Sequence, residues 1–276
     1  MLNNIAFIIL TFNEEKHISR CIASAKSVSD NIHVVDSFSN DNTEALCREA
    51  NVKFHKHIFI SHSNQINWAL ENINFNTKWI FRLDADEILS EPLVERLKSL
   101  SSNKHSDNIN GYLIRRIIWF QGKKIVWGGM KNIYHLRMWR TGKASCEDKF
   151  MDERMIINEG HKGYIHESIY DININPLEWW ISKHNKYSTN EVLDMIKTKT
   201  GTELNSSLFG THDSRRRYFK KLYQKLPSLS RAWLFFIYRY FFRLGFLDGY
   251  QGFIFHFMQC LWYRTLIDAK YKERTR

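Results

Sequence analysis

The sequence contains few of the residues that break or cross-link a chain. Of its 276 residues only 3 are proline and 4 are cysteine, whereas 43% are hydrophobic and 14% are aromatic. This composition excludes a disordered chain and supplies enough apolar side chains for a sizeable core. No CxxC pair occurs among Cys21, Cys47, Cys146 and Cys260. Their wide spacing favours neither a zinc site nor a disulfide framework and fits a reducing cytosol.

Signals for export and for crossing a membrane are also lacking. Asn3 and Asn4 precede only a short apolar run, without the basic and small-residue flanks of a secretory signal. The longest uncharged stretch of the C-terminal region, Gly249–Tyr263, has 15 residues, fewer than the roughly 20 needed to span a bilayer. We therefore expect a cytoplasmic protein that does not cross the membrane.

Acidic residues are scarce in one region only. Residues 1–214 contain 26 basic and 26 acidic side chains, whereas residues 215–276 contain 14 basic side chains and three acids, so the net charge of +11 lies in this tail. The tail also holds 14 of the 40 aromatic residues between Arg231 and Tyr263. Such a segment is typical of a peripheral anchor on an anionic membrane surface, here the inner face of the plasma membrane. The alternatives are that the aromatics pack on the catalytic domain or in a homodimer, or that the basic tail binds nucleic acid.

Apolar runs alternate with amphipathic stretches in the first hundred residues. Ile5–Leu10 has the pattern of a strand buried on both faces, and Asn13 is expected to cap the helix that follows. Ile32–Val35 predicts a second strand that ends at Asp36, and Trp79–Leu83 predicts another that leads into Asp84. This alternation predicts a doubly wound α/β domain that binds its ligand at the carboxyl ends of the strands. Thr11, Asp36 and Asp84 should then meet at one edge of the sheet.

Weaker patterns predict the remaining elements. Further strands are expected at Val52–His55, Tyr112–Trp119, Ile133–Trp139 and around Tyr164–Glu167, and helices at Gln65–Leu70 and Pro92–Leu100. The segment from Cys146 to Arg154 is irregular and rich in acids.

Two carboxylates one residue apart leave the end of the Trp79–Leu83 strand. Asp84-Ala85-Asp86 supplies hard oxygen ligands of the kind that Mg²⁺ and Mn²⁺ prefer, and such an ion would also bind substrate phosphates. Acidic triplets of this kind are common in loops and helix caps, so the motif alone is weak. Its position directly after a buried strand is what favours a metal site.

Four motifs in order resemble those of the family 2 glycosyltransferases, inverting enzymes with the GT-A fold. They are Ile8–Glu14, Val34–Thr43, Asn67–Leu70 and Leu83–Glu87. The resemblance implies a nucleotide-sugar site, with UDP-sugars favoured, formed by Thr11, Asn13, Glu14, Asp36, Asn67, Asp84, Ala85 and Asp86. It also implies that Asp84 and Asp86 hold Mn²⁺ or Mg²⁺ beside the diphosphate. Asn42 replaces a usual glycine of the second motif, and we expect it to adopt the left-handed conformation in its place.

An inverting transfer needs a base that deprotonates the acceptor hydroxyl. The acid-rich segment supplies candidates, with Asp152 preferred over Glu153 and Asp148. The alternative is that Glu147, Asp148 and Glu153 form a solvated charged stretch paired with Lys149 and Arg154. By the same resemblance His166 is a candidate third metal ligand, although a single histidine is more often an ordinary hydrogen-bonded residue.

The sequence thus predicts a GT-A catalytic domain over residues 1–170 and a helical, basic and aromatic extension over residues 171–276. The nucleotide-sugar half of the domain should end near residue 100, and the acceptor half should follow it. The expected function is sugar transfer to a lipid-linked or lipopolysaccharide-type acceptor. One rival hypothesis is a non-catalytic nucleotide- or sugar-binding protein of the same fold. The other is a nucleic-acid-binding protein, a function that would leave the arrangement of Asp36, Asp84 and Asp86 unexplained.

Overall fold

Two compact units make up the chain in the computed structural model, which describes residues 4–102, 108–147, 154–198 and 227–275. Unit 1 comprises Met1–Lys124 and Met130–Ile174, and unit 2 comprises Ile125–Gly129 and Asn175–Arg276. Unit 2 therefore takes in a short segment, 125–129, from within the stretch expected to form the catalytic domain. The basic residues 215–225 lie outside the described residues.

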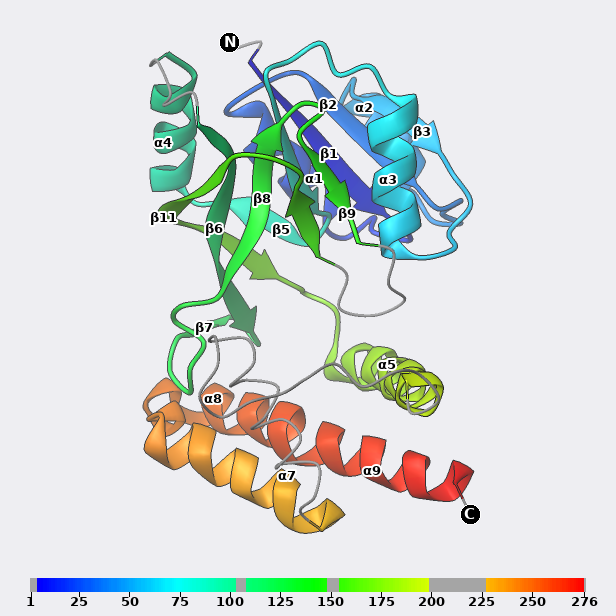
Figure 1. The fold of residues 1–276 in the computed structure, drawn as a ribbon, viewed down its shortest axis with the longest axis vertical. Coiled ribbons are helices and arrows are strands. Elements are labelled where there is room, and N and C mark those ends of the chain that lie inside the picture. The colour runs from blue at the N-terminus through cyan, green and yellow to red at the C-terminus, as the bar shows by residue number, and fades with distance from the viewer. Residues whose placement is uncertain (1–3, 103–107, 148–153, 199–226, 276) are drawn as a thin grey trace. The chain divides into compact units, whose positions relative to one another are not determined.

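A mixed sheet forms the centre of unit 1 (Figure 1). Its strands lie in the order β3-β2-β1-β4-β8-β6-β11-β5, and β7 pairs with β6. Their bounds are β1 Ile5–Thr11, β2 Ile32–Asp36, β3 Lys53–Lys56, β4 Trp79–Asp84, β5 Glu87–Leu89, β6 Ile109–Phe120, β7 Lys123–Ile125, β8 Tyr134–Arg140 and β11 His161–Ile172. The first four strands in the order are parallel, β8 is antiparallel to both of its neighbours, β11 is parallel to β6, and β5 is antiparallel to β11. The predicted α/β fold with a mixed sheet is confirmed.

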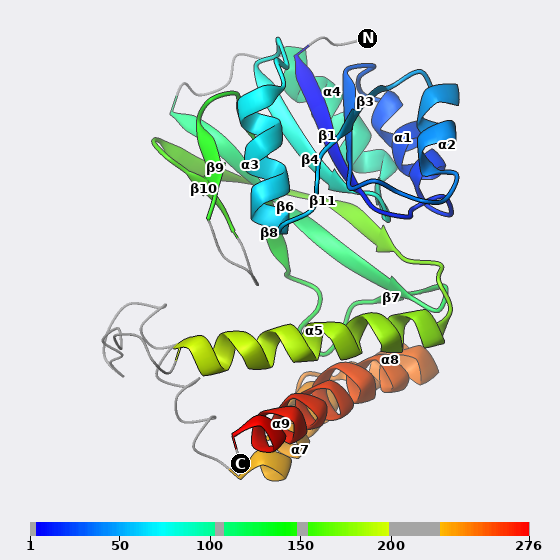
Figure 2. The same ribbon diagram turned by 90° about the vertical axis from the view of Figure 1, so that its right-hand side faces the viewer.

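Helices cover both faces of this sheet (Figure 2). They are α1 Ile18–Lys26, α2 Thr43–Glu49, α3 His62–Asn72 and α4 Glu91–Ser102. Successive side chains of a strand point to opposite faces, so Phe7 and Ile9 of β1 pack with α1, α2 and α4, whereas Ala6 and Ile8 pack with α3. Each face therefore has its own buried apolar layer, as the continuous apolar run of β1 predicts.

Two local predictions about the loops at the sheet edge are wrong. Asn13 does not cap α1, because the helix begins at Ile18 and Asn13 itself has a left-handed backbone, with φ of 55°. Asn42 is not left-handed either, since it precedes α2 with φ of −78°. The left-handed residue of that loop is Phe38, with φ of 61°. Hydrogen bonds between the two loops, described below, hold these conformations.

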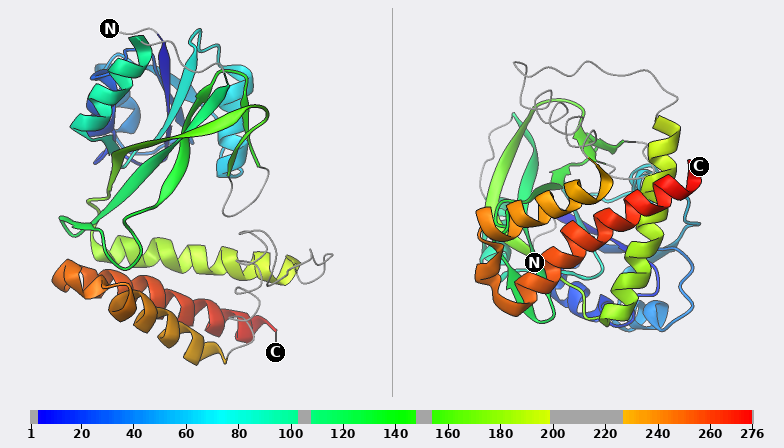
Figure 3. Two further views of the ribbon diagram at one scale, coloured as in Figure 1. Left: turned by 60° about the vertical axis from the view of Figure 1, so that its left-hand side comes forward. Right: turned by 90° about the horizontal axis from the view of Figure 1, so that it is seen from below.

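The described part of unit 2 after residue 176 is mainly helical. Its elements are α5 Leu177–Thr198, α7 Ser228–Ile237, the π-helix η1 Tyr238–Phe242, the 3₁₀ turn η2 Gly245–Asp248, α8 Gly249–His256, the π-helix η3 Phe257–Trp262 and α9 Tyr263–Arg274. The last three follow one another as a continuous helical rod, with α7 packed beside it (Figure 3). One small core joins α7 to η3 through Ala232, Phe236, Cys260 and Leu261, and another joins α5 to α9 through Val192, Tyr263 and Ile267. None of the helices within the described ranges is both long and apolar enough to cross a membrane.

Candidate functional site

The carboxyl ends of β1, β2 and β4 bring polar side chains to one edge of the sheet. Thr11 is paired in register with Asp36 of β2, and the neighbouring Leu10 is paired with Asp84 of β4. The predicted convergence of these three residues is therefore confirmed. It follows from parallel pairing, which aligns strand ends that are 25 and 48 residues apart along the chain.

Asp36 organises the loop that follows β2. Its side chain is almost completely buried, with 1% exposed. One carboxylate oxygen accepts hydrogen bonds from Thr11 Oγ1, at 2.9 Å, and from the Ser39 hydroxyl, and the other accepts one from the Ser39 backbone N–H, at 2.8 Å. Because a buried carboxylate is costly without such donors, these bonds stabilise the left-handed turn at Phe38.

The loops after β1 and β2 are joined by reciprocal hydrogen bonds. The Asn13 N–H donates to Ser39 Oγ, and the Asn40 N–H donates to Asn13 Oδ1, both at 2.8 Å. The Glu14 N–H donates to Thr43 Oγ1 at the start of α2, also at 2.8 Å. Loops held in this way lose little conformational freedom when a ligand binds between them.

Glu14 connects these loops to the segment after β11. Its Oε2 lies 2.6 Å from Nδ1 of the buried His17, and the Ile174 N–H donates to the other ring nitrogen, Nε2, at 3.1 Å. Because Nε2 accepts a hydrogen bond, Nδ1 carries the ring hydrogen and donates it to Glu14. The chain after β11 thus contributes to the same edge, and the sequence contains no local signal for this.

Asp84 is surrounded by arginine side chains. Its side chain is 33% exposed. One carboxylate oxygen accepts from Arg82 at 3.1 Å, and the other accepts from Arg137 of β8 at 2.9 Å. Burial raises the pKa of Asp84, but the charges of Arg137 and Arg82 outweigh it and hold the pKa well below its ordinary value. The group is therefore an anion over the whole physiological pH range.

Asp86 has a different environment although it is only two residues away. Its Oδ2 accepts a hydrogen bond from Asn173 Nδ2 at 3.0 Å, and its backbone carbonyl accepts one from the Ile172 N–H at 2.9 Å. The intervening Ala85 packs into the core, with 3% exposed. Asp86 is partly exposed and is bonded to a neutral amide, so its oxygens are better placed than those of Asp84 to coordinate Mg²⁺ or Mn²⁺.

A buried charge network lies beneath the two aspartates, and the sequence analysis did not predict it. Glu87 is completely buried and contacts Arg137 at 2.5 Å and Arg116 of β6 at 3.3 Å, and it accepts a hydrogen bond from the Asp84 N–H at 3.0 Å. Arg116 also pairs with Asp171. Burial raises the pKa of Glu87, against the attraction of the arginines. The signal available in the sequence was a glutamate next to the acidic pair and arginines within apolar strands, where unpaired charges are rarely tolerated.

His166 is not assembled with the two aspartates. Its Nδ1 lies 2.8 Å from the Tyr134 hydroxyl, and its ring stacks on Tyr164. Within the described residues, no group of three or more histidine, cysteine, aspartate or glutamate side chains is arranged to hold a metal ion. The role of His166 as a third metal ligand therefore stays a prediction without geometric support.

Asn67 has a structural partner. Its side-chain amide donates to the Cys146 carbonyl at 3.0 Å and accepts from the Cys146 N–H at 2.9 Å, which uses both ends of the group. Cys146 ends β9 (Ala144–Cys146), which pairs antiparallel with β10 (Met155–Ile157). A direct contact of Asn67 with the nucleotide stays a prediction, whereas its contact with β9 is shown.

The base candidates Asp148, Asp152 and Glu153 lie outside the described residues, but the residues that flank them do not. The Glu147 N–H donates to the Arg154 carbonyl at 2.9 Å, directly beyond the β9–β10 pair. Asn67 thus fixes the strand from which the chain enters the acidic segment.

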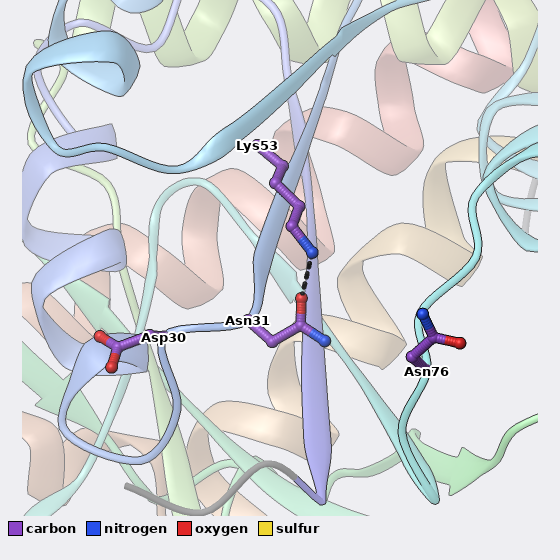
Figure 4. Close-up of a pocket in the computed structure, with 4 residues that line it drawn as sticks. All are labelled: Asp30, Asn31, Lys53 and Asn76. Atoms are coloured by element: carbon purple, nitrogen blue, oxygen red, sulfur yellow. Dashed lines mark hydrogen bonds between the residues drawn. The ribbon is translucent and has the colours of Figure 1, made fainter.

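A pocket of about 350 Å³ lies elsewhere in unit 1 (Figure 4). Its lining residues, Asp30, Asn31, Lys53 and Asn76, precede or begin β2, β3 and β4. They are therefore at the amino ends of the parallel strands, at the edge opposite Asp36 and Asp84. Ligands of open α/β sheets bind at the carboxyl ends, so this pocket is not the candidate site.

Comparison with known proteins agrees with the geometry. Residues 6–149 match the model of the family described as glycosyl transferase family 2. The chain belongs to this family. Among family 2 relatives, an uncharacterized glycosyltransferase of Rickettsia felis is 24% identical over 261 residues, which cover 92% of this chain and 84% of the relative. The lipopolysaccharide core biosynthesis glycosyltransferase LpsC of Rhizobium meliloti is 31% identical over 191 residues, or 67% of this chain and 68% of LpsC.

A solved structure shows the same fold at low sequence identity. The mannosyltransferase PcManGT from Pyrobaculum calidifontis, solved in complex with GDP-Man and Mn²⁺, is 12% identical and superposes with a TM-score of 0.55 over 99% of this chain and 88% of its own. The family 2 protein described here thus has the α/β, GT-A-like mixed sheet followed by C-terminal helices.

Proposed function

We propose that this family 2 glycosyltransferase is an inverting, divalent-cation-dependent enzyme that transfers a sugar from a nucleoside diphosphate sugar, with UDP-sugars favoured. The observation that carries the proposal is the register of the sheet, which places Thr11 beside Asp36 and brings Asp84 and Asp86 to the same edge. Groups that can hydrogen-bond to a nucleoside then lie next to two carboxylates that can hold a cation for its diphosphate.

The nucleoside is proposed to bind between the loops after β1 and β2. Their mutual hydrogen bonds support this assignment, because they pre-shape the two loops before a ligand arrives. Phe12, with 55% of its side chain exposed, offers an apolar surface against which a base can pack. Thr11, Asn13, Glu14 and Asp36 supply the polar groups nearby.

The diphosphate is proposed to lie over Asp84 and Asp86. Asp86, whose side chain is partly exposed and accepts a hydrogen bond from the neutral Asn173 amide, is the principal candidate for a metal ligand, and Asp84 adds a second anionic oxygen. A bound Mn²⁺ or Mg²⁺ would stabilise the negative charge of the departing diphosphate. Arg137 and Arg82 limit the repulsion between Asp84 and that diphosphate.

The acceptor is proposed to be a lipid-linked saccharide or a lipopolysaccharide-type glycan, with Asp152 as the base that deprotonates its hydroxyl. This class of acceptor is supported by the 31% identity with LpsC, a lipopolysaccharide core biosynthesis glycosyltransferase. A cytoplasmic location on the inner face of the plasma membrane belongs to the same proposal.

The proposal predicts that turnover depends on Asp86 and on a divalent cation. We expect a panel of nucleotide sugars to identify one that is hydrolysed in the presence of Mn²⁺. Asp86→Asn should reduce this turnover by about 100-fold or more, because it removes an anionic ligand at the site of leaving-group charge. A partly exposed edge residue contributes little to packing, so the change in unfolding free energy should stay within about 0.5 kcal/mol.

Asp30→Asn is a matched control, since it makes the same chemical change on an exposed residue at the opposite edge of the sheet. It should leave turnover unchanged. Activity that persists in excess chelator would contradict the cation requirement. Tight binding of a nucleotide sugar without turnover, with every acceptor and donor tried, would favour a non-catalytic binding protein of the same fold.

A further inference from the structure

Large apolar side chains are concentrated on the exposed surface of one part of unit 2. Between residues 233 and 257 many bulky residues are more than a third exposed, and Phe242 and Tyr250 reach 76% and 69%. We call the exposed side chains of Trp233, Tyr238, Phe241, Phe242, Phe246 and Tyr250 the aromatic surface. Contiguous apolar patches of this kind are uncommon on proteins that only contact water and usually mark an interaction site.

The helical spacing places the exposed side chains of α7 and η1 on one side of the helix. Helix α7 continues directly into η1, and the exposed residues recur along it in pairs, at 233 and 234, at 237 and 238, and at 241 and 242. The opposite side of the same helix, with Ala232 and Phe236, is already buried against Cys260 and Leu261. An ordinary surface helix has one apolar side and one polar side, whereas this one is apolar on both.

The second part of the aromatic surface, on η2 and α8, is continuous with the first. The ring of the half-buried Tyr240 lies 5.1 Å from that of the exposed Phe241 and 6.3 Å from that of Phe246, and it lies 5.6 Å from that of Phe253. Phe253 is itself 40% exposed. Rings in contact therefore join α7 and η1 to η2 and α8 in one apolar surface.

The acids of the C-terminal region are turned inward. The carboxylate of Asp248, 4% exposed, accepts hydrogen bonds from the N–H groups of Val126 and Trp127, and Asp268, 6% exposed, pairs with Arg231. Of the three acids in residues 215–276 only Glu273 is exposed. The arginine next to Phe242, Arg243, is exposed as well. Between residues 233 and 257, the stretch that carries the aromatic surface, Arg243 is thus exposed and no acid is.

We propose that the aromatic surface docks on the anionic face of a lipid bilayer, with its rings at the depth of the headgroups and α7, η1 and α8 lying along the membrane. Aromatic side chains beside arginine fit this interface, because the rings are partly apolar and the cation meets anionic lipid. A symmetric dimer through the same surface would bring Arg243 of two copies towards each other without acids between them. Charge therefore favours an anionic lipid surface over a second copy of the chain.

Cosedimentation of the full chain with vesicles tests the proposal. We expect binding to vesicles that contain 30% phosphatidylglycerol and weak binding to pure phosphatidylcholine vesicles. Phe241→Ser combined with Phe242→Ser should lower the partition coefficient by about tenfold or more, because two interfacial rings are lost. Arg243→Gln should lower it by about fivefold at low salt, the factor that corresponds to one cation at an anionic surface.

Phe59→Ser combined with Ile60→Ser is the matched control, since it removes two apolar side chains that are 50% and 61% exposed in unit 1. It should leave vesicle binding unchanged. High salt should release only part of the wild-type protein, because salt screens the charge of the arginines but not the apolar contact.

Equal binding to neutral and anionic vesicles, or none to either, would overturn the proposal. So would light scattering that shows a dimer which Phe241→Ser and Phe242→Ser convert to a monomer, because the surface would then be an interface between copies. Vesicle binding is measured without turnover, and nucleotide-sugar hydrolysis is measured without vesicles. Failure of this proposal is thus distinguishable from failure of the proposed function.

Discussion

At the scale of single residues, the two aspartates of the acidic motif differ in what surrounds them. Asp84 contacts Arg82 and Arg137, whereas Asp86 accepts a hydrogen bond from the neutral Asn173. The motif letters suggest two equivalent ligands. The structure instead gives Asp84 a charge-compensated position and leaves Asp86 better placed to bind a cation.

Arg137 is predicted to be a main determinant of stability at this edge. It contacts Asp84 and the completely buried Glu87, so Arg137→Met would leave Glu87 with less compensation in a low-dielectric environment. Removing one partner of a buried ion pair costs about 3 to 5 kcal/mol of unfolding free energy. Urea denaturation measures this loss.

Arg48→Met provides the comparison for Arg137→Met. Arg48 also pairs with a glutamate, Glu44, at 2.6 Å, but its side chain is 69% exposed. Pairs of that kind contribute only about 0.3 to 0.5 kcal/mol. Equal effects of the two substitutions would contradict the interpretation that burial makes the Arg137 network costly to break.

Asp152 is predicted to act on the acceptor and not on the donor. Asp152→Asn should abolish sugar transfer to an acceptor while the affinity for the nucleotide sugar is kept, because an amide cannot accept the proton of the attacking hydroxyl. Donor affinity is measured by calorimetry and transfer by product analysis. Near-normal transfer would move the role to Glu153 or Asp148.

At the scale of elements, sharp changes of direction bring distant segments together. Only Ala85 and Asp86 separate β4 from β5, which pair with different partners in the sheet, so the acidic motif lies where the chain crosses between them. The segment after β11 returns to the same place and contributes Asn173 and Ile174. Residues from two distant parts of the chain thus meet at Asp86.

The packing of α8 in unit 2 places a titratable residue where its charge is unfavourable. His256 is completely buried, and neither ring nitrogen has a hydrogen-bond partner among the described residues. A Cβ added to Gly128 or Gly245 would lie 2.2 and 2.7 Å from its ring, so both positions require glycine for this packing. Burial, together with the nearby charge of Arg239, lowers the pKa of His256 to about 4.

This shift predicts an acid-sensitive contribution to stability. As the pH falls below 6.5 the unfolded chain takes up a proton at His256, whereas the folded chain does so only near pH 4, so acid favours unfolding across this window. The contribution is about 3 kcal/mol, fully present above pH 6.5 and lost by pH 4. His256→Leu should flatten this part of the pH dependence in urea titrations and change stability little at pH 7, because no hydrogen bond is lost.

His161→Leu serves as the control for the acid-dependence experiment, since His161 is exposed on β11. It should reproduce the wild-type slope between pH 6.5 and pH 4. An unchanged slope in the His256→Leu protein would show that the ring nitrogens of His256 are solvated in the folded state.

At the scale of the whole molecule, charge and apolar surface divide along the chain. Residues 1–214 are charge-balanced and include the candidate site, and residues 215–276 hold the whole net charge of +11. The two units have separate apolar cores, so the aromatic surface of unit 2 is not required for the packing of the sheet. We therefore expect donor chemistry and membrane docking to be separable by mutation.

The sequence by itself determined the strands that form the centre of the sheet and the edge that carries the candidate site. Continuous apolar runs such as Ile5–Leu10 and Trp79–Leu83 specify buried strands locally, and parallel pairing then brings Thr11, Asp36 and Asp84 together. The family motifs lie in these same segments, which is why the fold and the position of the site were predicted from them.

Only the tertiary structure decided what each of these residues contacts. Glu87 contacts Arg137 and Arg116, and Asp86 contacts Asn173. In each pair the two residues are at least 29 positions apart in the sequence, so no local pattern specifies the contact. The same holds for the start of α1, the bonds of Asn67 to Cys146 and the outward orientation of the aromatic side chains of α7 and η1. Periodicity shows which side chains share a face of a helix, but the contacts between helices determine which face is buried.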